Sequence, residues 1–325
     1  MSGITPINPV STDSSSIDLD DAQRALQACI GEVAGVVLGK QDQIRMALCC
    51  LLARGHLLIE DLPGMGKTTL AHALGDALGL AYRRIQFTSD MLPADVLGAS
   101  IFDRESGEFR FVEGPVFTQL LLADEINRTT PKTQSALLEA MEEKQVSIDG
   151  QTRALPEPFF VIATQNPGSQ SGTYALPESQ LDRFLMRIEV GYPGHDAERE
   201  MLRAGLSAQH RKPVQQRMRV EQLLTLQKQV DKLKVSDALL DYLQRLVDYS
   251  RNAADFAYGL SPRGALALLQ SAKAAALVEG RGHVIPEDLQ AVLPWVAAHR
   301  IAPVGGTLSG GIGLVAQMLD AVDVI

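Results

Sequence analysis

Residues 57–71, LLIEDLPGMGKTTLA, form the stretch that decides the fold of this chain. Its opening apolar run is typical of a buried strand, its Pro-Gly pair marks a turn, and a helix is expected from about Lys67 onward. This order of strand, loop and helix is what a phosphate-binding loop requires. Gly64 and Gly66 lack a Cβ, so the backbone can direct several N–H groups at one anion. Lys67 adds a positive charge, and the Thr68 hydroxyl is placed to ligate Mg²⁺.

The match to the strict phosphate-loop pattern, G-x-x-x-x-G-K-[ST], is partial because Asp61 occupies the position of the first glycine. An ordinary Gly-rich turn with an incidental Lys-Thr pair is the alternative interpretation, so the rest of the chain has to decide. The helix that follows would point its positive N-terminal end at bound phosphates. The candidate residues for binding a nucleotide are Leu62, Pro63, Gly64, Met65, Gly66, Lys67, Thr68 and Thr69.

Composition restricts the classes of protein to which the chain can belong. Its 325 residues allow one large or two medium domains, and 46% of them are hydrophobic, which is enough for a sizeable core. A net charge of −9 argues against nucleic acid as an obligate partner, because phosphate contacts need a basic face. The three cysteines suit a reducing compartment. With no signal peptide and no run of membrane-spanning length, we expect a cytoplasmic protein without a membrane span.

Two carboxylates follow the apolar run 118–123, which is typical of a buried parallel strand. Ligand chemistry in open α/β sheets takes place at the carboxyl ends of strands. Asp124 is therefore suited to hold Mg²⁺ through water, and Glu125 is suited to polarise an attacking water. A strand that ends in a solvated acidic turn is the alternative, and it becomes improbable when a Gly-x-Gly-Lys-Thr loop lies upstream.

A polar amide occupies the corresponding position on another strand. The run 159–164 predicts a buried strand, and Asn166 follows it at the carboxyl end. That amide can orient a water molecule between Glu125 and a γ phosphate. A turn-forming Asn before Pro167 is the plain alternative.

The remaining patterns predict two inserted hairpins and a helical second half. Hairpins are expected at about 99–112 and 146–155, the second around an Asp-Gly turn. We place a domain boundary at the break GYPG, residues 191–194, and expect everything after it to be helical. The predicted domains are a disordered tail over 1–19, a nucleotide-binding core over 20–193 and a helical domain over 194–325.

Individual helix ends are also predicted in this second half and at the N-terminus. Asp20 or Asp21 is expected to cap the first helix, Ser236 caps a helix of the second half, and Ser261-Pro262 begins another. The region 305–313 is Gly-rich and expected to be flexible, with a last helix from Leu314.

With these motifs in this order, the chain resembles the AAA+ ATPases and, more closely, the MoxR family. The resemblance covers about residues 20–300, and its most specific segments are EDLPGMGKT at 60–68, ADEINR at 123–128, EAMEE at 139–143, ATQNP at 163–167 and LPESQLDRF at 176–184. The fold that it implies is a P-loop NTPase αβα sandwich with a parallel sheet, followed by a small all-α lid domain. Such families tolerate the departure at Asp61.

The resemblance also implies roles for individual residues. Lys67 and Thr68 would belong to Walker A, and Asp124 and Glu125 to Walker B. Asn166 would be sensor 1, Arg183 the arginine finger of a neighbouring subunit, and Arg263 sensor 2. The segment Val37, Leu38 and Gly39 would lie against the adenine. The two hairpins would be the helix-2 and presensor-1 insertions near the central hole of a ring.

The function implied by the resemblance is hydrolysis of Mg·ATP between subunits of a homo-oligomeric, hexameric ring. The work done would be chaperone-like remodelling of a protein client, or cofactor insertion, with a partner that carries a von Willebrand factor A (VWA) domain. The ATPase subunit of a metal chelatase is one alternative, since it has the same insertions. A nucleotide-gated scaffold with little turnover is another, although Glu125 argues against it. DNA translocation is disfavoured by the acidic charge. Arg183 pairing within its own subunit is the alternative to its role as a finger.

Overall fold

The central layer of the molecule is a five-stranded parallel sheet, seen in a computed structural model that describes residues 17–166, 172–205, 213–306 and 310–324. The strand order is β2-β5-β8-β1-β9. The strands are β1 (Leu57–Glu60), β2 (Tyr82–Gln86), β5 (Leu120–Asp124), β8 (Phe160–Gln165) and β9 (Met186–Ile188). β1, β5 and β8 are apolar and buried on both faces, as expected for inner parallel strands.

Helices cover both faces of this sheet. Alternate residues of β1 point to opposite faces, so Leu57 and Ile59 join one hydrophobic cluster and Leu58 joins the other. The first cluster includes α1 (Leu19–Ala34), α2 (Gln41–Leu52) and α3 (Lys67–Leu78). The second includes α4 (Pro93–Leu97), η1 (Ile126–Arg128) and α5 (Pro131–Glu143), and α6 (Glu178–Leu181) packs against it. The predicted αβα sandwich is confirmed.

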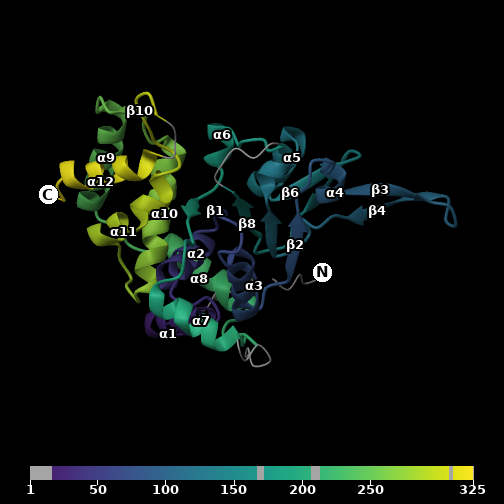
Figure 1. The fold of residues 1–325 in the computed structure, drawn as a ribbon, viewed down its shortest axis with the longest axis horizontal. Coiled ribbons are helices and arrows are strands. Elements are labelled where there is room, and N and C mark those ends of the chain that lie inside the picture. Colours follow the sequence, from purple (N-terminus) through teal and green to yellow (C-terminus); the bar gives the residue numbers. More distant parts are fainter. Residues whose placement is uncertain (1–16, 167–171, 206–212, 307–309, 325) are drawn as a thin grey trace, which may run out of the picture.

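Two hairpins extend from the core where the sequence predicts them. They are β3 (Gly98–Asp103) with β4 (Glu108–Glu113), and β6 (Gln145–Ile148) with β7 (Gln151–Ala154). The β3–β4 hairpin projects far beyond the sheet, on the side opposite the C-terminal helices (Figure 1). The guanidinium of Arg153 on β7 lies 4.0 Å above the ring of Phe111 on β4, so the two hairpins touch.

The C-terminal part, which is predicted to be the lid, is mostly helical (Figure 1). Its helices are α7 (His195–Gly205), α8 (Val220–Lys232), α9 (Asp237–Asn252), α10 (Pro262–Val278), α11 (Pro286–Ala297) and α12 (Gly311–Ala321). Ser236 caps α9 and Ser261 caps α10 through their hydroxyls, which confirms both predicted starts. In the described part of the chain, no helix has both the length and the apolar character that crossing a bilayer requires.

Three details of the sequence-based prediction need correction. The cap of α1 is Asp18, whose side chain accepts from the Asp20 N–H at 2.9 Å, instead of Asp20 or Asp21. The last helix begins at Gly311, three residues before Leu314, so part of the predicted flexible region is helical. The second half is not entirely helical, because β10 (Phe256–Tyr258) and β11 (Ala302–Pro303) pair in an antiparallel ribbon.

The predicted domain limits stay predictions. Residues 1–16 of the expected tail lie outside the described residues, and so do residues 307–309 of the Gly-rich region. The chain turns between the end of β9 and the start of α7, where we place the boundary. One hydrophobic cluster nevertheless runs from α1–α3 into the lid helices, so the lid packs directly on the core.

Candidate functional site

The loop between β1 and α3 has the backbone shape of an anion cradle. Gly64 and Gly66 adopt positive φ angles of 85° and 86°, which side-chain-bearing residues rarely adopt. Apart from the glycine itself and its two chain neighbours, no heavy atom lies within 4 Å of the position that a Cβ would take at either glycine. The loop leads into the N-terminus of α3 at Lys67, where free N–H groups and the helix dipole favour an anion.

Lys67 points along the inside of this loop. Its Nζ donates to the carbonyl oxygens of Asp61 at 2.5 Å and Leu62 at 3.2 Å, and to Asn166 Oδ1 at 3.2 Å. Burial lowers the pKa of Lys67, and the carboxylates of Asp61, Asp124 and Glu125 oppose that shift. The ammonium therefore lies between the loop and the carboxyl ends of the central strands.

Asp61, the departure from the strict loop pattern, has a structural role of its own. One carboxylate oxygen accepts from the Leu62 N–H at 2.8 Å, and the other accepts from the Gly191 N–H at 2.5 Å. The side chain thus ties the start of the loop to the segment that follows β9. A glycine at this position could not make either contact.

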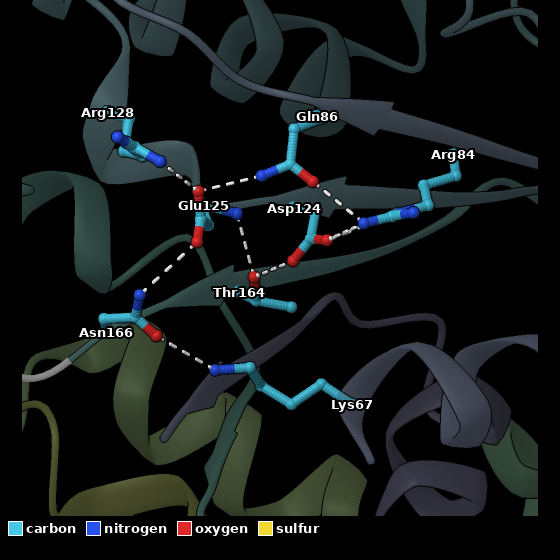
Figure 2. Close-up of polar contacts among 8 residues, drawn as sticks. All are labelled: Lys67, Arg84, Gln86, Asp124, Glu125, Arg128, Thr164 and Asn166. Atoms are coloured by element: carbon cyan, nitrogen blue, oxygen red, sulfur yellow. Dashed lines mark hydrogen bonds and ion pairs between the residues drawn. The ribbon is translucent and has the colours of Figure 1, made fainter. Parts of the chain in front are cut away.

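The two acids at the end of β5 are joined by a threonine of the neighbouring strand (Figure 2). Thr164 Oγ1 donates to Asp124 Oδ1 at 2.6 Å and accepts from the Glu125 N–H at 2.8 Å. Arg84 of β2 binds the other oxygen of Asp124 through Nη2 at 2.6 Å and Nε at 3.2 Å. Asp124 is therefore oriented from both neighbouring strands, and its carboxylate keeps acceptor capacity for a metal-bound water.

Glu125 is the point where several polar side chains converge (Figure 2). It lies just after β5 with a positive φ of 57°, which turns its side chain away from the strand direction. Gln86 Nε2 donates to its Oε2 at 2.8 Å, and Arg128 Nη1 lies 2.9 Å from the same oxygen. Asn166 Nδ2 lies 3.5 Å from the other oxygen, Oε1. One oxygen is thus held firmly and the other only weakly.

A cavity of about 270 Å³ opens beside the loop and suits the base of a nucleotide. Of the three residues predicted to contact adenine, Val37 and Leu38 line it. Gly39 is absent from the lining, and its positive φ of 70° and its close approach to Ala197 position the segment beside α7. The remaining lining residues are Val36, Lys40, Gly64, Met65, Gly66, Thr69, Gly191, Pro193 and Met201.

The two predicted arginines lie together, apart from this cluster. Arg183 Nη1 is 2.9 Å from Glu142 Oε2, and Arg263 Nη2 contacts the other oxygen of the same carboxylate. Arg183 also donates to the Leu138 carbonyl at 2.9 Å. The cavity that they line includes His56, the residue before β1, so it lies at the amino end of the sheet. The phosphate loop follows the carboxyl end of the same strand.

The structure therefore brings Lys67, Asp124, Glu125 and Asn166 to one place and leaves Arg183 and Arg263 at another. Thr68 lies exposed in the first turn of α3, with Thr69 beside it in the cavity wall. Sequence reasoning missed Arg84, Arg128, Thr164 and Glu142. Of these four residues, only Arg84 could have been found from the sequence. It lies two residues before Gln86 on a predicted strand, so the two side chains share one face.

Two family models match the chain. The model for the ATPase family associated with various cellular activities (AAA) matches residues 56–186, and the AAA lid domain matches residues 248–307. A solved structure of a protein from Cytophaga hutchinsonii, described as a candidate ATPase, superposes with a TM-score of 0.85 at 36% identity. The match covers 94% of this chain and 96% of that chain.

Two relatives are similar over most of their length. Uncharacterized protein YeaC from Bacillus subtilis is 43% identical over 282 residues, which is 87% of this chain and 88% of the relative. Chaperone MoxR1 from Mycobacterium tuberculosis is 41% identical over 286 residues, which is 85% of this chain and 75% of the relative. The chain belongs to the MoxR family of AAA+ ATPases, and it is an ATP hydrolase with a P-loop αβα core and a helical lid.

Proposed function

We propose that this protein binds ATP between neighbouring subunits of a homo-oligomeric, hexameric ring, with the phosphate loop from one subunit and the arginines from the next. The observation that carries the proposal is the placement of these two groups at opposite ends of β1. Four strand residues at about 3.3 Å each separate the ends by roughly 13 Å. Arg183 and Arg263 are therefore better placed for a phosphate that another subunit brings to the amino end.

Binding uses the loop, α3 and the adjacent cavity. The backbone N–H groups near Gly64 and Gly66 hold the phosphates, Lys67 neutralises the β and γ phosphates, and the cavity beside Val37 takes the base. Thr68 and Asp124 would hold Mg²⁺ together with phosphate oxygens, which is the ligand set that this ion usually takes. When bound, Mg²⁺ neutralises charge that develops on the phosphates.

Hydrolysis uses the side chains at the ends of β5 and β8. Glu125 Oε1, the oxygen held only weakly, accepts a proton from the attacking water. Asn166 lies between Lys67 and Glu125, where its amide can orient that water against the γ phosphate. The neighbour's Arg183 would stabilise the charge of the transition state, which is how arginine fingers accelerate such reactions.

The work that hydrolysis supports is remodelling of a protein client. A relative named Chaperone MoxR1 supports this reading. So does the β3–β4 hairpin, which projects beyond the sheet (Figure 1). Its Phe102 and Phe109 are exposed and stack edge to face at 5.3 Å. Exposed aromatic rings of this kind mark binding surfaces. A VWA-domain protein is the partner that we propose, with cofactor insertion into a client as one outcome.

Subunit mixing tests the shared site. Glu125→Gln removes the base from the site of its own loop, and Arg183→Ala removes the finger that is given to a neighbour. Each variant alone should hydrolyse ATP poorly. Mixed, an Arg183→Ala subunit keeps its own Glu125 and receives an intact Arg183 from a Glu125→Gln neighbour, so phosphate release should recover in part.

The matched control mixes Glu125→Gln with Lys67→Ala, because both changes lie in the half of the site at the carboxyl end of the sheet. A Glu125→Gln subunit lacks its base whatever its neighbour, and a Lys67→Ala subunit lacks its phosphate contact, so this mixture should stay inactive. Co-sedimentation of tagged subunits shows that mixed assemblies form. If mixed assemblies form and the first mixture also stays inactive, the shared site is contradicted.

A further inference from the structure

Glu142 binds two arginines that come from different parts of the molecule. It lies in the last turn of α5, Arg183 follows α6 in the core, and Arg263 lies in the first turn of α10 in the lid. Its Oε2 pairs with Arg183 at 2.9 Å, and its Oε1 pairs with Arg263. One carboxylate therefore joins the lid to the core.

The geometry of this contact resembles that of a bound phosphate. Each of two oxygens on one anionic group takes one guanidinium, and phosphate presents its oxygens to arginines in the same way. Within the described residues, Glu142 is the one carboxylate that forms an ion pair with either arginine. It therefore occupies the position that an external anion would need.

The surroundings of Glu142 favour an anion that comes from outside the subunit. The contact lies at a cavity of about 240 Å³ that is lined by the cationic side chains of Arg54, Lys144, Arg183, Arg263 and Arg300. Asp182 is the other acid in the lining, and it is engaged by the buried Arg300 at 2.6 Å. Arg54 is paired with Asp231 outside the lining at 2.6 Å, and the remaining cations still outnumber the two carboxylates, so one terminal phosphate would add negative charge that the cavity lacks.

The contact is also open to exchange. The side chains of Arg183, Glu142 and Arg263 are 31%, 35% and 48% exposed, so water screens their attraction and exposed pairs of this kind are weak. A carboxylate that stayed beside the arginines would repel an arriving phosphate. The Glu142 carboxylate and a phosphate cannot both pair closely with the two arginines, so binding of one anion weakens binding of the other.

We propose that Glu142 is a resident counter-ion that competes with the phosphate of a neighbouring subunit's ATP for Arg183 and Arg263. It thereby sets the protein concentration at which ATP assembles the subunits. Glu142 is a positioning residue, because it acts through the arginines. This inference rests on the proposed sharing of the site between subunits, which the mixing experiment tests separately.

The experiment measures ATP-dependent assembly of the full chain. All variants carry Glu125→Gln to suppress hydrolysis, and sedimentation velocity with Mg·ATP gives the protein concentration of half-assembly. Glu142→Gln keeps the shape of the side chain and removes its charge, so the concentration of half-assembly should fall about two- to fivefold. Glu142→Asp keeps the charge, so its concentration of half-assembly should stay closer to that of the parent.

Glu143→Gln is the matched control, since Glu143 is the next residue of α5, is exposed and has no ion pair in the described part of the chain. It changes the net charge equally and should leave half-assembly unchanged. Adding Arg263→Ala to both the parent and the Glu142→Gln variant should abolish most of the difference between them, because the competition needs the arginine.

Three results would overturn the proposal. They are an unchanged or higher half-assembly concentration for folded Glu142→Gln, an equal fall for Glu143→Gln, and an effect of Glu142→Gln that survives Arg263→Ala. Thermal unfolding shows whether the variants fold, and a wild-type nucleotide affinity of the monomer provides a second check. If subunit mixing succeeds and Glu142→Gln does not promote assembly, the shared site stands and the counter-ion role fails.

Discussion

The two ends of β1 differ in charge, burial and completeness. At the carboxyl end, Lys67 at the start of α3 lies with two acids at the end of β5 and an amide that follows β8 (Figure 2). At the amino end, Arg183 and Arg263 share one carboxylate at an exposed cavity. At the carboxyl end, Arg84 and Arg128 are engaged by Asp124 and Glu125, and at the amino end Arg183 and Arg263 pair with no carboxylate but Glu142 among the described residues. In the proposed ring, each end supplies what the other end of a neighbouring subunit needs.

The contacts at these two ends also differ in how firmly they are held. Asp124 is buried and receives hydrogen bonds from Thr164, which is fully buried, and from Arg84. Preorganised polar groups of this kind need little rearrangement during catalysis. The arginine contacts are partly exposed and can exchange partners at small cost. A single chain thus organises one half of the proposed site and leaves the other half adjustable.

The largest expected effect separates the two ends by function. Arg183→Ala should lower the rate of ATP hydrolysis about 1,000-fold, because it removes charge stabilisation in the transition state. Nucleotide affinity of the monomer should stay near the wild-type value, since Arg183 lies far from the loop of its own subunit. Lys67→Ala should instead weaken nucleotide binding about tenfold to a hundredfold, because it removes a charged hydrogen-bond donor.

Fluorescent nucleotide titration of dilute protein and a phosphate-release assay measure these two quantities. Arg219→Ala and Lys132→Ala, which change exposed residues outside both regions, serve as controls. The assignment of different functions to the two ends of β1 is contradicted if Arg183→Ala weakens nucleotide binding by the monomer as much as Lys67→Ala does.

The next effect concerns the pH dependence of stability and His56, which lines the arginine cavity at the amino end of β1. Its Nε2 donates to the Met141 carbonyl and its Nδ1 accepts from the Val161 N–H, so the buried ring is neutral. Burial lowers the pKa of His56 to about 4. The unfolded chain binds a proton here below pH 6.5 and the native chain does not, so stability falls as the pH drops from about 6.5 to 4. The expected loss at pH 5 is about 2 kcal/mol.

Denaturant unfolding at pH 7 and pH 5 measures this loss. His56→Gln should reduce the difference in unfolding free energy between the two pH values. His195→Gln, at a histidine that is 89% exposed, should leave it unchanged. If the unfolding free energy of His56→Gln depends on pH as strongly as that of the wild type, His56 is not the cause of the pH dependence.

The smallest effect concerns the restraint on Glu125 at the carboxyl end. Gln86 and Arg128 both hold Glu125 Oε2, so removing one of them should free the carboxylate to accept a proton from water. We expect Gln86→Ala to raise basal hydrolysis about threefold, less than a full hydrogen bond to a carboxylate would give, because Arg128 keeps its contact with the same oxygen. Thr88→Ala is the control, because Thr88 follows the same strand but bonds to Asp90. A lower rate in Gln86→Ala would show that Gln86 supports the base instead of restraining it.

Much of the fold could be predicted because its signals are local. The apolar run before the phosphate loop, the Asp-Gly turn and the capping Ser236 each act over a few residues. The features that were missed depend on distant partners. The strands β10 and β11 have three and two residues, which is too short to show an alternating apolar pattern. They form because residues about 45 positions apart pair. Asp18 caps α1 although Asp20 and Asp21 match the pattern equally well.

The same division applies to the candidate site. Asp124, Glu125 and Asn166 could be found because each follows an apolar strand, and parallel strands place their carboxyl ends together. Thr164 and Arg84 join them only because β5 lies between β2 and β8 in the sheet order. Glu142 and Glu143 are adjacent and chemically alike in the sequence, and only the packing of α5 decides which of them meets the arginines.

Residue order alone was sufficient to identify a nucleotide-binding loop, the acids and amide that serve it, and the family. Such motifs are compact because the phosphate chemistry requires particular residues at short spacings. Residue order could not show that Arg183 and Arg263 share Glu142, or that these arginines lie at the opposite end of β1 from Lys67. Those relations join a core helix to a lid helix 121 positions away, and they arise only when the hydrophobic cluster packs the lid against the sheet.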